Sequence, residues 1–186
     1  MSVALAAAVI ATSLRLVASH AYAEGAPPGF SGGFKEDSCH ACHFDAEPNS
    51  GPGNVTLDGV PATFAPGERY PVTITLRRPA MKLAGFQLTV RAADSGVQAG
   101  SLAPDVGDSE RVAVETQAGV QYASHTKAGT AVNADAAVWT LVWTAPKRGV
   151  AVVFHVAANA ADGNESADGD FVYTASAHFA PQKTGW

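Results

Sequence analysis

Cysteine is scarce in this sequence, and so are charged and helix-favouring side chains. Only two of the 186 residues are cysteines, and charged residues make up 16%. Lys, Glu and Leu are few, whereas Ala, Val, Thr and Gly are abundant, a balance that favours β structure. The chain has 12 basic and 17 acidic residues and no basic cluster, which argues against a nucleic-acid partner. Hydrophobic residues make up 47%, enough for one domain to bury a core.

Long apolar runs are missing after the first residues of the chain. The run at residues 4–14 is too short to span a bilayer as a mature helix but has the length of the apolar region of an export signal. Ala21-Tyr22-Ala23 fits the small-x-small cleavage rule, so we expect residues 1–23 to be a signal peptide and Glu24 to be the first mature residue. An ordinary N-terminal helix is the alternative, because no Lys or Arg precedes the run and Arg15 follows it. After cleavage we expect no transmembrane segment.

The two cysteines that are present form one motif, Cys39-His40-Ala41-Cys42-His43. This C-x-x-C-H spacing is typical of covalent c-type haem attachment. Each thiol adds to one vinyl group of the porphyrin and forms a thioether, and His43 then offers its imidazole to the iron as the proximal ligand. We therefore predict one covalent haem c, held by Cys39 and Cys42, with its iron bound by His43. The export signal agrees with this prediction, because such haem is attached outside the cytoplasmic membrane.

Three other interpretations of the cysteine pair are open. A thioredoxin-like dithiol would require a βαβ context, which the pattern does not show. A structural zinc site would require further Cys or His at close spacing, and none follows. A disulfide between Cys39 and Cys42 would close a very small loop and stabilise the chain little.

Hydrophobic residues alternate with period two along most of the chain from Val55 onward. The clearest runs are residues 70–76, 86–91, 112–115, 138–143, 150–156 and 171–179. Turn-forming residues separate these runs, which predicts an all-β fold, an immunoglobulin-like antiparallel β-sandwich. Residues 24–54 lack periodicity and are rich in Gly and Pro, so they predict an irregular haem-binding arm. The expected organisation is a signal peptide at 1–23, the arm at 24–54 and the sandwich at 55–186.

The block at residues 66–181 resembles the reeler domain in its bacterial form. The matching pieces, in order, are Pro66-Gly67-x-x-Tyr70, Ala84-Gly85-Phe86-Gln87-Leu88-Thr89-Val90-Arg91, Gly96, Ala99-Gly100, Tyr122-x-x-His125-Thr126, Trp139-x-x-x-Trp143-Thr144-Ala145-Pro146, Gly149-Val150-x-Val152-x-Phe154, Ala157-Ala158-Asn159 and Asp168-Gly169-Asp170. Residues 26–45 are similar to the start of exported bacterial reeler-like proteins of the choice-of-anchor group. The resemblance implies an immunoglobulin-like sandwich behind a haem-binding motif in a periplasmic or extracellular bacterial protein. It implies fold and haem more firmly than a biological role.

The sixth position of the iron has two leading candidates. Met81 is the one methionine that remains after cleavage, and it lies in a loop between two predicted strands. We predict Met81 as the sixth ligand, since a thioether would raise the reduction potential as in His/Met cytochromes. The alternative role for Met81 is a gap filler at a strand end. His125 is the alternative ligand, although its segment resembles one found in reeler domains without the haem arm, which favours a structural role.

The remaining histidines of the mature chain are weaker candidates. His155 and His178 alternate with apolar residues, as expected for sheet or solvent-facing side chains. His40 is constrained by the cysteine pair and is expected to be exposed. An open, five-coordinate iron is the remaining alternative.

The sequence gives only weak signals for a calcium site or a catalytic site. The loop at residues 162–170 resembles a calcium loop by composition but lacks the EF-hand ligand pattern, so calcium stays open. No Ser/His/Asp triad or carboxylate pair is evident, which favours an electron carrier over an enzyme.

Together these features predict an exported monohaem c-type cytochrome that exchanges electrons with a redox partner protein. Loss of Arg15 with the signal would bring the formal net charge from −5 to −6, which favours a basic face on that partner. One alternative is a non-redox extracellular binding or adhesion module of reeler type. The other is a haem-based ligand sensor or peroxidase with an open sixth position.

Overall fold

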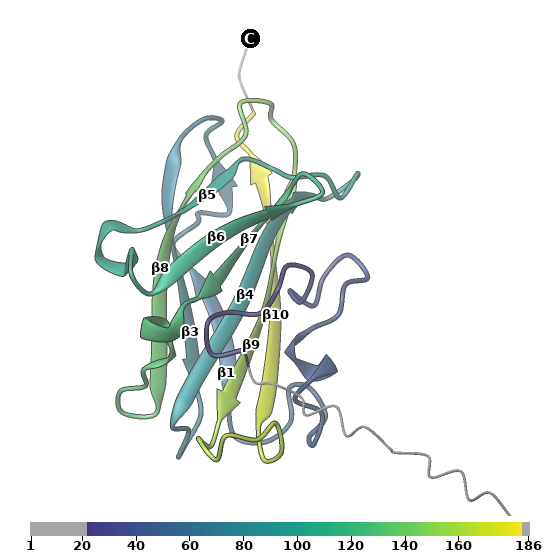
Figure 1. The fold of residues 1–186 in the computed structure, drawn as a ribbon. Helices are drawn as coiled ribbons and strands as arrows, with labels where there is room; N and C mark the ends of the chain where they lie inside the picture. The colour runs from purple at the N-terminus through teal and green to yellow at the C-terminus, as the bar shows by residue number, and fades with distance from the viewer. Residues whose placement is uncertain (1–21, 184–186) are drawn as a thin grey trace, which may run out of the picture.

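The computed structural model describes residues 22–183, which form two β-sheets packed face to face (Figure 1). The strands in this part of the chain are β1 (Asn54–Asp58), β2 (Thr63–Phe64), β3 (Arg69–Arg77), β4 (Leu83–Ala92), β5 (Ser101–Pro104), β6 (Val112–Gln117), β7 (Val120–His125), β8 (Ala136–Thr144), β9 (Val152–Ala161) and β10 (Phe171–Pro181). Three short 3-10 helices accompany them: η1 (Cys39–Ala41), η2 (Val106–Asp108) and η3 (Lys127–Thr130). The all-β sandwich expected from the sequence is confirmed.

The strand order is β1-β3-β8-β5 in one sheet and β2-β10-β9-β4-β7-β6 in the other. Neighbouring strands pair antiparallel except β2 and β10, which pair in parallel. β2 lies on the crossover from β1 to β3 and pairs only with the last two residues of β10, Ala180 and Pro181. This short edge pair is the one departure from the expected antiparallel arrangement.

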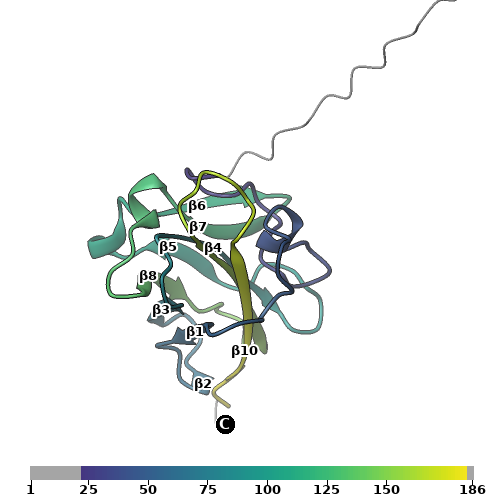
Figure 2. The same cartoon turned by 90° about the horizontal axis from the view of Figure 1, so that it is seen from below.

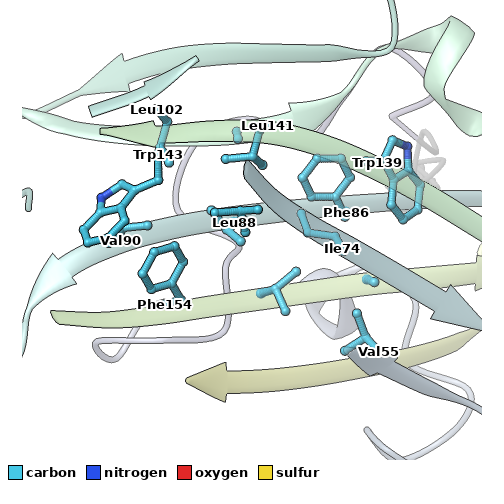
Figure 3. Packing of buried hydrophobic residues seen from close by; sticks show 14 of the residues in the cluster. Val55, Ile74, Phe86, Leu88, Val90, Leu102, Trp139, Leu141, Trp143 and Phe154 are labelled. Carbon is cyan, nitrogen blue, oxygen red and sulfur yellow. The ribbon is translucent and has the colours of Figure 1, made fainter. Parts of the chain in front are cut away.

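The period-two pattern of the sequence matches the buried faces of the two sheets. On β8, Trp139, Leu141 and Trp143 are fully buried, and the residues between them are more exposed. The ring of Trp139 lies 4.7 Å from that of Phe86, and the ring of Trp143 lies 5.1 Å from that of Phe154. Figure 3 shows these side chains meeting between the sheets. Each indole N–H donates to a backbone carbonyl, so the polar atoms of both tryptophans are satisfied inside the core.

Four strands, β1, β2, β5 and β7, were not predicted individually. β7 carries Ala123 and His125 on alternate positions where a buried strand usually has large apolar residues, so its pattern is weak. β5 is only four residues long and ends at a proline. β9 begins at Val152, two residues later than the alternating run suggested.

The arm crosses the outer face of the six-stranded sheet, as both views of the fold show (Figures 1 and 2). Polar side chains on the outer face of β4 hold it there. Gln87 is fully buried; its Oε1 accepts from the Phe30 amide (2.6 Å) and its Nε2 donates to the Pro27 carbonyl (2.9 Å). Arg91 forms an ion pair with Glu36 of the arm. The arm is therefore attached to the sheet at several points.

Most of the predicted signal peptide lies outside the described residues, which include only Tyr22 and Ala23 of it. Within residues 22–183, no helix is long and apolar enough to cross a membrane. Export stays a prediction from the sequence.

Candidate functional site

The cysteine motif folds into one tight turn. Ser38 caps η1, because its Oγ accepts a hydrogen bond from the amide of His40 (3.2 Å). The amide of His43 donates to the carbonyl of Cys39 (3.0 Å), which closes the turn. As a result Cys39, Cys42 and His43 all line the same cavity.

The imidazole of His43 is oriented by a buried carboxylate. Its Nδ1 lies 2.7 Å from the Oδ2 of Asp170, which is 1% exposed. Asn159 donates from its Nδ2 to the same oxygen (3.0 Å). Because a carboxylate accepts hydrogen bonds, Nδ1 carries a proton, and in the neutral form of the ring the lone pair lies on Nε2. This arrangement is the one that metal-bound histidines adopt toward a carboxylate partner.

Elements distant in sequence place these two polar groups beside the motif. Asn159 lies on the outer face of β9, and Asp170 directly precedes β10. The Oδ1 of Asp170 accepts from the amide of Asp162, which ties the β9–β10 loop to the same carboxylate (3.1 Å). Asp170 therefore links the β9–β10 loop to the imidazole of His43. Among residues 22–183, no group of three or more His, Cys, Asp or Glu side chains is arranged to hold a metal ion, so the calcium interpretation of residues 162–170 gains no support.

The cavity beside the motif is largely apolar. It has a volume of about 860 Å³, including the part that opens to solvent. Pro27 and Phe30 of the arm and Leu83 and Phe86 of β4 contribute apolar walls, and His125 completes the lining near η3. Its lining is typical of small-molecule and cofactor pockets, which are largely apolar with a few placed polar groups.

His125 takes a position that the backbone ladder leaves open. Pairing of β4 with β7 stops at Gln87 and Ser124, and the imidazole of His125 follows in place of the next backbone partner. The amide of Phe86 donates to its Nδ1 (3.0 Å), and its Nε2 lies 3.2 Å from the carbonyl of Tyr22. Burial lowers the pKa of His125, and the nearby His43 lowers it further although the two backbone contacts oppose the shift. The ring is therefore neutral at pH 7.

A glycine makes room for this imidazole. A Cβ added at Gly85 would lie 2.5 Å from the Cε1 of His125, too close for any side chain without displacement of the ring. Gly85 also pairs with Asn159 in the β4–β9 ladder. Asn159, which lies beside His43, and Gly85, which makes room for His125, are therefore directly opposite each other on adjacent strands.

The Cys39 thiol lies in a structural rather than a reactive environment. Burial raises the pKa of Cys39 to about 12, so this thiol stays protonated at neutral pH. Reactive dithiols instead have lowered pKa values, because the thiolate is the nucleophile. The folded site therefore disfavours the thioredoxin-like interpretation.

The other candidate residues lie apart from the cavity. Met81 is 3% exposed and belongs to the hydrophobic core, not to the cavity lining, so the structure does not bring it to the motif. His155 is half-buried on the outer face of β9 and packs edge-on against Phe34 (5.0 Å). His178 is exposed. His40, expected to be exposed, is half-buried, because η1 packs beside β9.

Asp170, Asn159 and Gly85 organise the site, but the sequence analysis named them only as parts of the reeler resemblance and predicted no role for them beside the cysteine motif. Asn159 was detectable as the one amide side chain in the otherwise apolar run of residues 156–160. Asp170 was hidden among the acidic residues of the preceding loop. Gly85 had no local signal, since its role depends on a side chain 40 residues away.

Comparisons with known proteins address the fold. No protein-family model matches the chain. No curated protein matches it significantly. Among solved structures, it is similar to the reeler domain of human F-spondin (fragment 1), with 16% identity, a TM-score of 0.50, and coverage of 73% of this chain and 93% of that domain.

Two further solved structures are similar at slightly lower scores. The Reelin-N domain of F-spondin has 17% identity and a TM-score of 0.49, with coverage of 77% of this chain and 97% of that one. A cohesin module from a family 33 glycoside hydrolase of Clostridium perfringens has 11% identity and a TM-score of 0.48, with coverage of 71% and 98%. The human F-spondin likeness shows the fold alone: this chain is an all-β two-sheet sandwich that resembles reeler domains.

Proposed function

We propose that this protein is an exported monohaem c-type cytochrome in which a reeler-like sandwich carries one covalent haem beside its N-terminal arm. The observation that carries the proposal is the convergence of Cys39, Cys42 and His43 on one apolar cavity. The contact between His43 and Asp170 supports it, because it leaves Nε2 of His43 available to iron. Export rests on the leader predicted at residues 1–23.

The residues present fit the group in number and in chemistry. Two thiols can each add across one vinyl group; the sulfur bonds to carbon, the S–H hydrogen passes to the neighbouring vinyl carbon, and no oxidant is consumed. The raised pKa of Cys39 makes this thiol a weak nucleophile once the chain is folded. We therefore expect attachment to precede folding of the arm. The apolar walls suit a porphyrin, whose faces are hydrophobic.

Bound haem would supply one-electron redox chemistry, and the chain's own residues would set its conditions. His43 would bind the iron through Nε2. Asp170 holds the proton on Nδ1, which makes the imidazole a stronger electron donor. The apolar side chains of the arm and β4 limit access of water. A mature formal charge of −6 would favour association with a basic partner surface.

The test is the state of the cysteines in protein produced with the haem-maturation machinery. We expect haem mass on the denatured chain, a c-type pyridine haemochrome spectrum, and pigment that survives acid-acetone extraction. Cys42→Ala should lose stable covalent haem. His40→Gln, within the same motif but at a position that binds nothing, is the matched control and should keep it. An intact mass equal to the bare polypeptide would refute the proposal.

A non-redox binding module is the second candidate. Two observations favour it: the reeler-like fold and the apolar cavity, which could take a small apolar ligand. In that case Cys39 and Cys42 would remain free thiols or form a disulfide, and the maturation machinery would add no mass. An environment-sensitive apolar dye should then bind to the wild type. Loss of this binding in Phe30→Asp, which alters the cavity wall, would identify the ligand site.

A further inference from the structure

We infer that His125 supplies the second axial ligand of the haem, and that the backbone carbonyl of Tyr22 occupies its Nε2 until the leader is removed. This inference rests on the proposed function and specifies its iron site. It replaces Met81 as the preferred ligand on the basis of where the two side chains lie.

The positions of His125 and Met81 relative to the cavity favour His125. His125 and His43 line the same cavity, one from the end of β7 and the other from the arm. Met81 is 3% exposed within the core cluster and does not reach the cavity. Ligation by Met81 would require this side chain to leave the core, whereas His125 already faces the cavity that the cysteines line.

The surroundings of His125 are built for an imidazole. Gly85 leaves space where a Cβ would come within 2.5 Å of the ring. Gly129 on η3 lies close behind, since a Cβ there would be 3.3 Å from the Cβ of His125. Gly85 lets the ring lie against the backbone of β4, and a larger residue at this position would displace the ring.

Phe86 can satisfy the ring in either tautomer. With Nε2–H donating toward Tyr22, Nδ1 accepts from the amide of Phe86 (3.0 Å). The carbonyl of Phe86 also lies 3.3 Å from Nδ1. If Nε2 gives its lone pair to a metal, the proton lies on Nδ1, and the ring must turn from the amide of Phe86 toward that carbonyl to donate to it. A backbone carbonyl on the second ring nitrogen is a common partner of metal-bound histidine.

Tyr22 is the group that keeps Nε2 engaged in the described chain. Its carbonyl accepts both from His125 and from the amide of Gly25 (3.1 Å). The predicted cleavage after Ala23 would remove Tyr22 and free Nε2 on the cavity side. Because the contact is made by the backbone, cleavage releases it and a side-chain substitution does not.

The ligand is tested on the mature chain starting at Glu24 with its covalent haem. Ferric absorption and electron paramagnetic resonance should show low-spin iron with bis-imidazole g values and no weak red thioether band. His125→Ala should keep the covalent haem yet turn the iron high-spin, and free imidazole should restore the low-spin spectrum. Met81→Leu, a volume-matched core substitution, should leave the spectrum unchanged.

Several results would overturn the assignment. A red thioether band that Met81→Leu abolishes would assign the ligand to Met81. High-spin iron in the wild type would indicate an open position suited to a ligand sensor. Loss of covalent haem from every form would refute the proposed function as well, so the two failures are distinguishable. If His125→Ala does not fold, the wild-type g values and the Met81→Leu spectrum decide the ligand.

Two haem-loaded chains that begin at different residues test the role of Tyr22. If an export leader is fused directly before Tyr22, its cleavage yields a longer mature chain that keeps Tyr22 and Ala23. We expect a larger high-spin fraction in this protein than in the chain starting at Glu24. Tyr22→Ala in the longer chain should behave like the longer chain itself, because the carbonyl remains. Equal spectra for the longer and shorter chains would overturn the capping role.

Discussion

At the scale of single residues, Asp170 is the least expected part of the site. It stands 127 residues after His43, is almost completely buried, and accepts hydrogen bonds from the imidazole, from Asn159 and from the amide of Asp162. A buried carboxylate is costly unless it is paired in this way. Its position therefore indicates a role in holding His43 and the β9–β10 loop together.

If the proposed haem is bound, Asp170→Asn should raise its reduction potential, because a neutral amide no longer strengthens electron donation from His43. It should also lower the free energy of unfolding by about 1.5–3 kcal/mol, the usual range for a hydrogen bond to a charged group. Spectroelectrochemical titration and urea unfolding measure the two effects.

The matched control is Asp168→Asn, which removes the same charge from an exposed position in the same loop. It should change neither quantity appreciably. A potential that shifts equally in both variants would indicate a general charge effect and contradict the positioning role of Asp170.

At the scale of elements, the arm and the sandwich meet on a polar sheet face. Outward residues of β4 such as Gln87 and Arg91 contact the arm, whereas inward residues such as Leu88 belong to the core. If the arm were absent, these polar groups would be hydrated instead of being left unpaired. β1 begins at Asn54, so the boundary expected between residues 54 and 55 falls at the first residue of the sandwich.

A chain of residues 53–183 should therefore fold without the arm. It keeps all ten strands, and we expect β-type circular dichroism with cooperative unfolding. A chain that starts after Asp58 is the informative comparison, because it loses β1 and should be less stable. A disordered spectrum for residues 53–183 would show that the arm is needed for folding.

At the scale of the whole molecule, stability should depend on pH through His155. Burial lowers the pKa of His155, and the neighbouring His178 and Arg91 lower it further. Phe34 covers one edge of its ring, and Gly33 passes beside it. The unfolded chain therefore takes up this proton more readily than the folded chain.

The folded state should have its full stability above about pH 6.5, the ordinary pKa of histidine, and lose stability as the pH falls through that value. Urea unfolding between pH 8 and pH 5 measures the slope. His155→Gln should show a smaller loss on acidification than the wild type. Equal slopes in the two proteins would contradict the contribution of His155.

Several properties were readable from the sequence by itself. Alternation at positions such as Trp139, Leu141 and Trp143 predicted buried strands, because one face of a sandwich sheet must be apolar. The spacing of Cys39, Cys42 and His43 predicts a haem motif from only five residues, and the bound haem itself stays a prediction. Both signals lie within a few neighbouring residues, so no tertiary information was needed to detect them.

Only the tertiary structure decided which distant groups share the cavity. Met81 and His125 were both plausible ligands from the sequence, and packing places the first in the core and the second at the cavity. Asp170 reaches His43 because β9 and β10 return the chain to the arm. The imidazole of His125 fits only because Gly85, on another strand, has no side chain. Such contacts join residues that are far apart in sequence, so no local pattern encodes them.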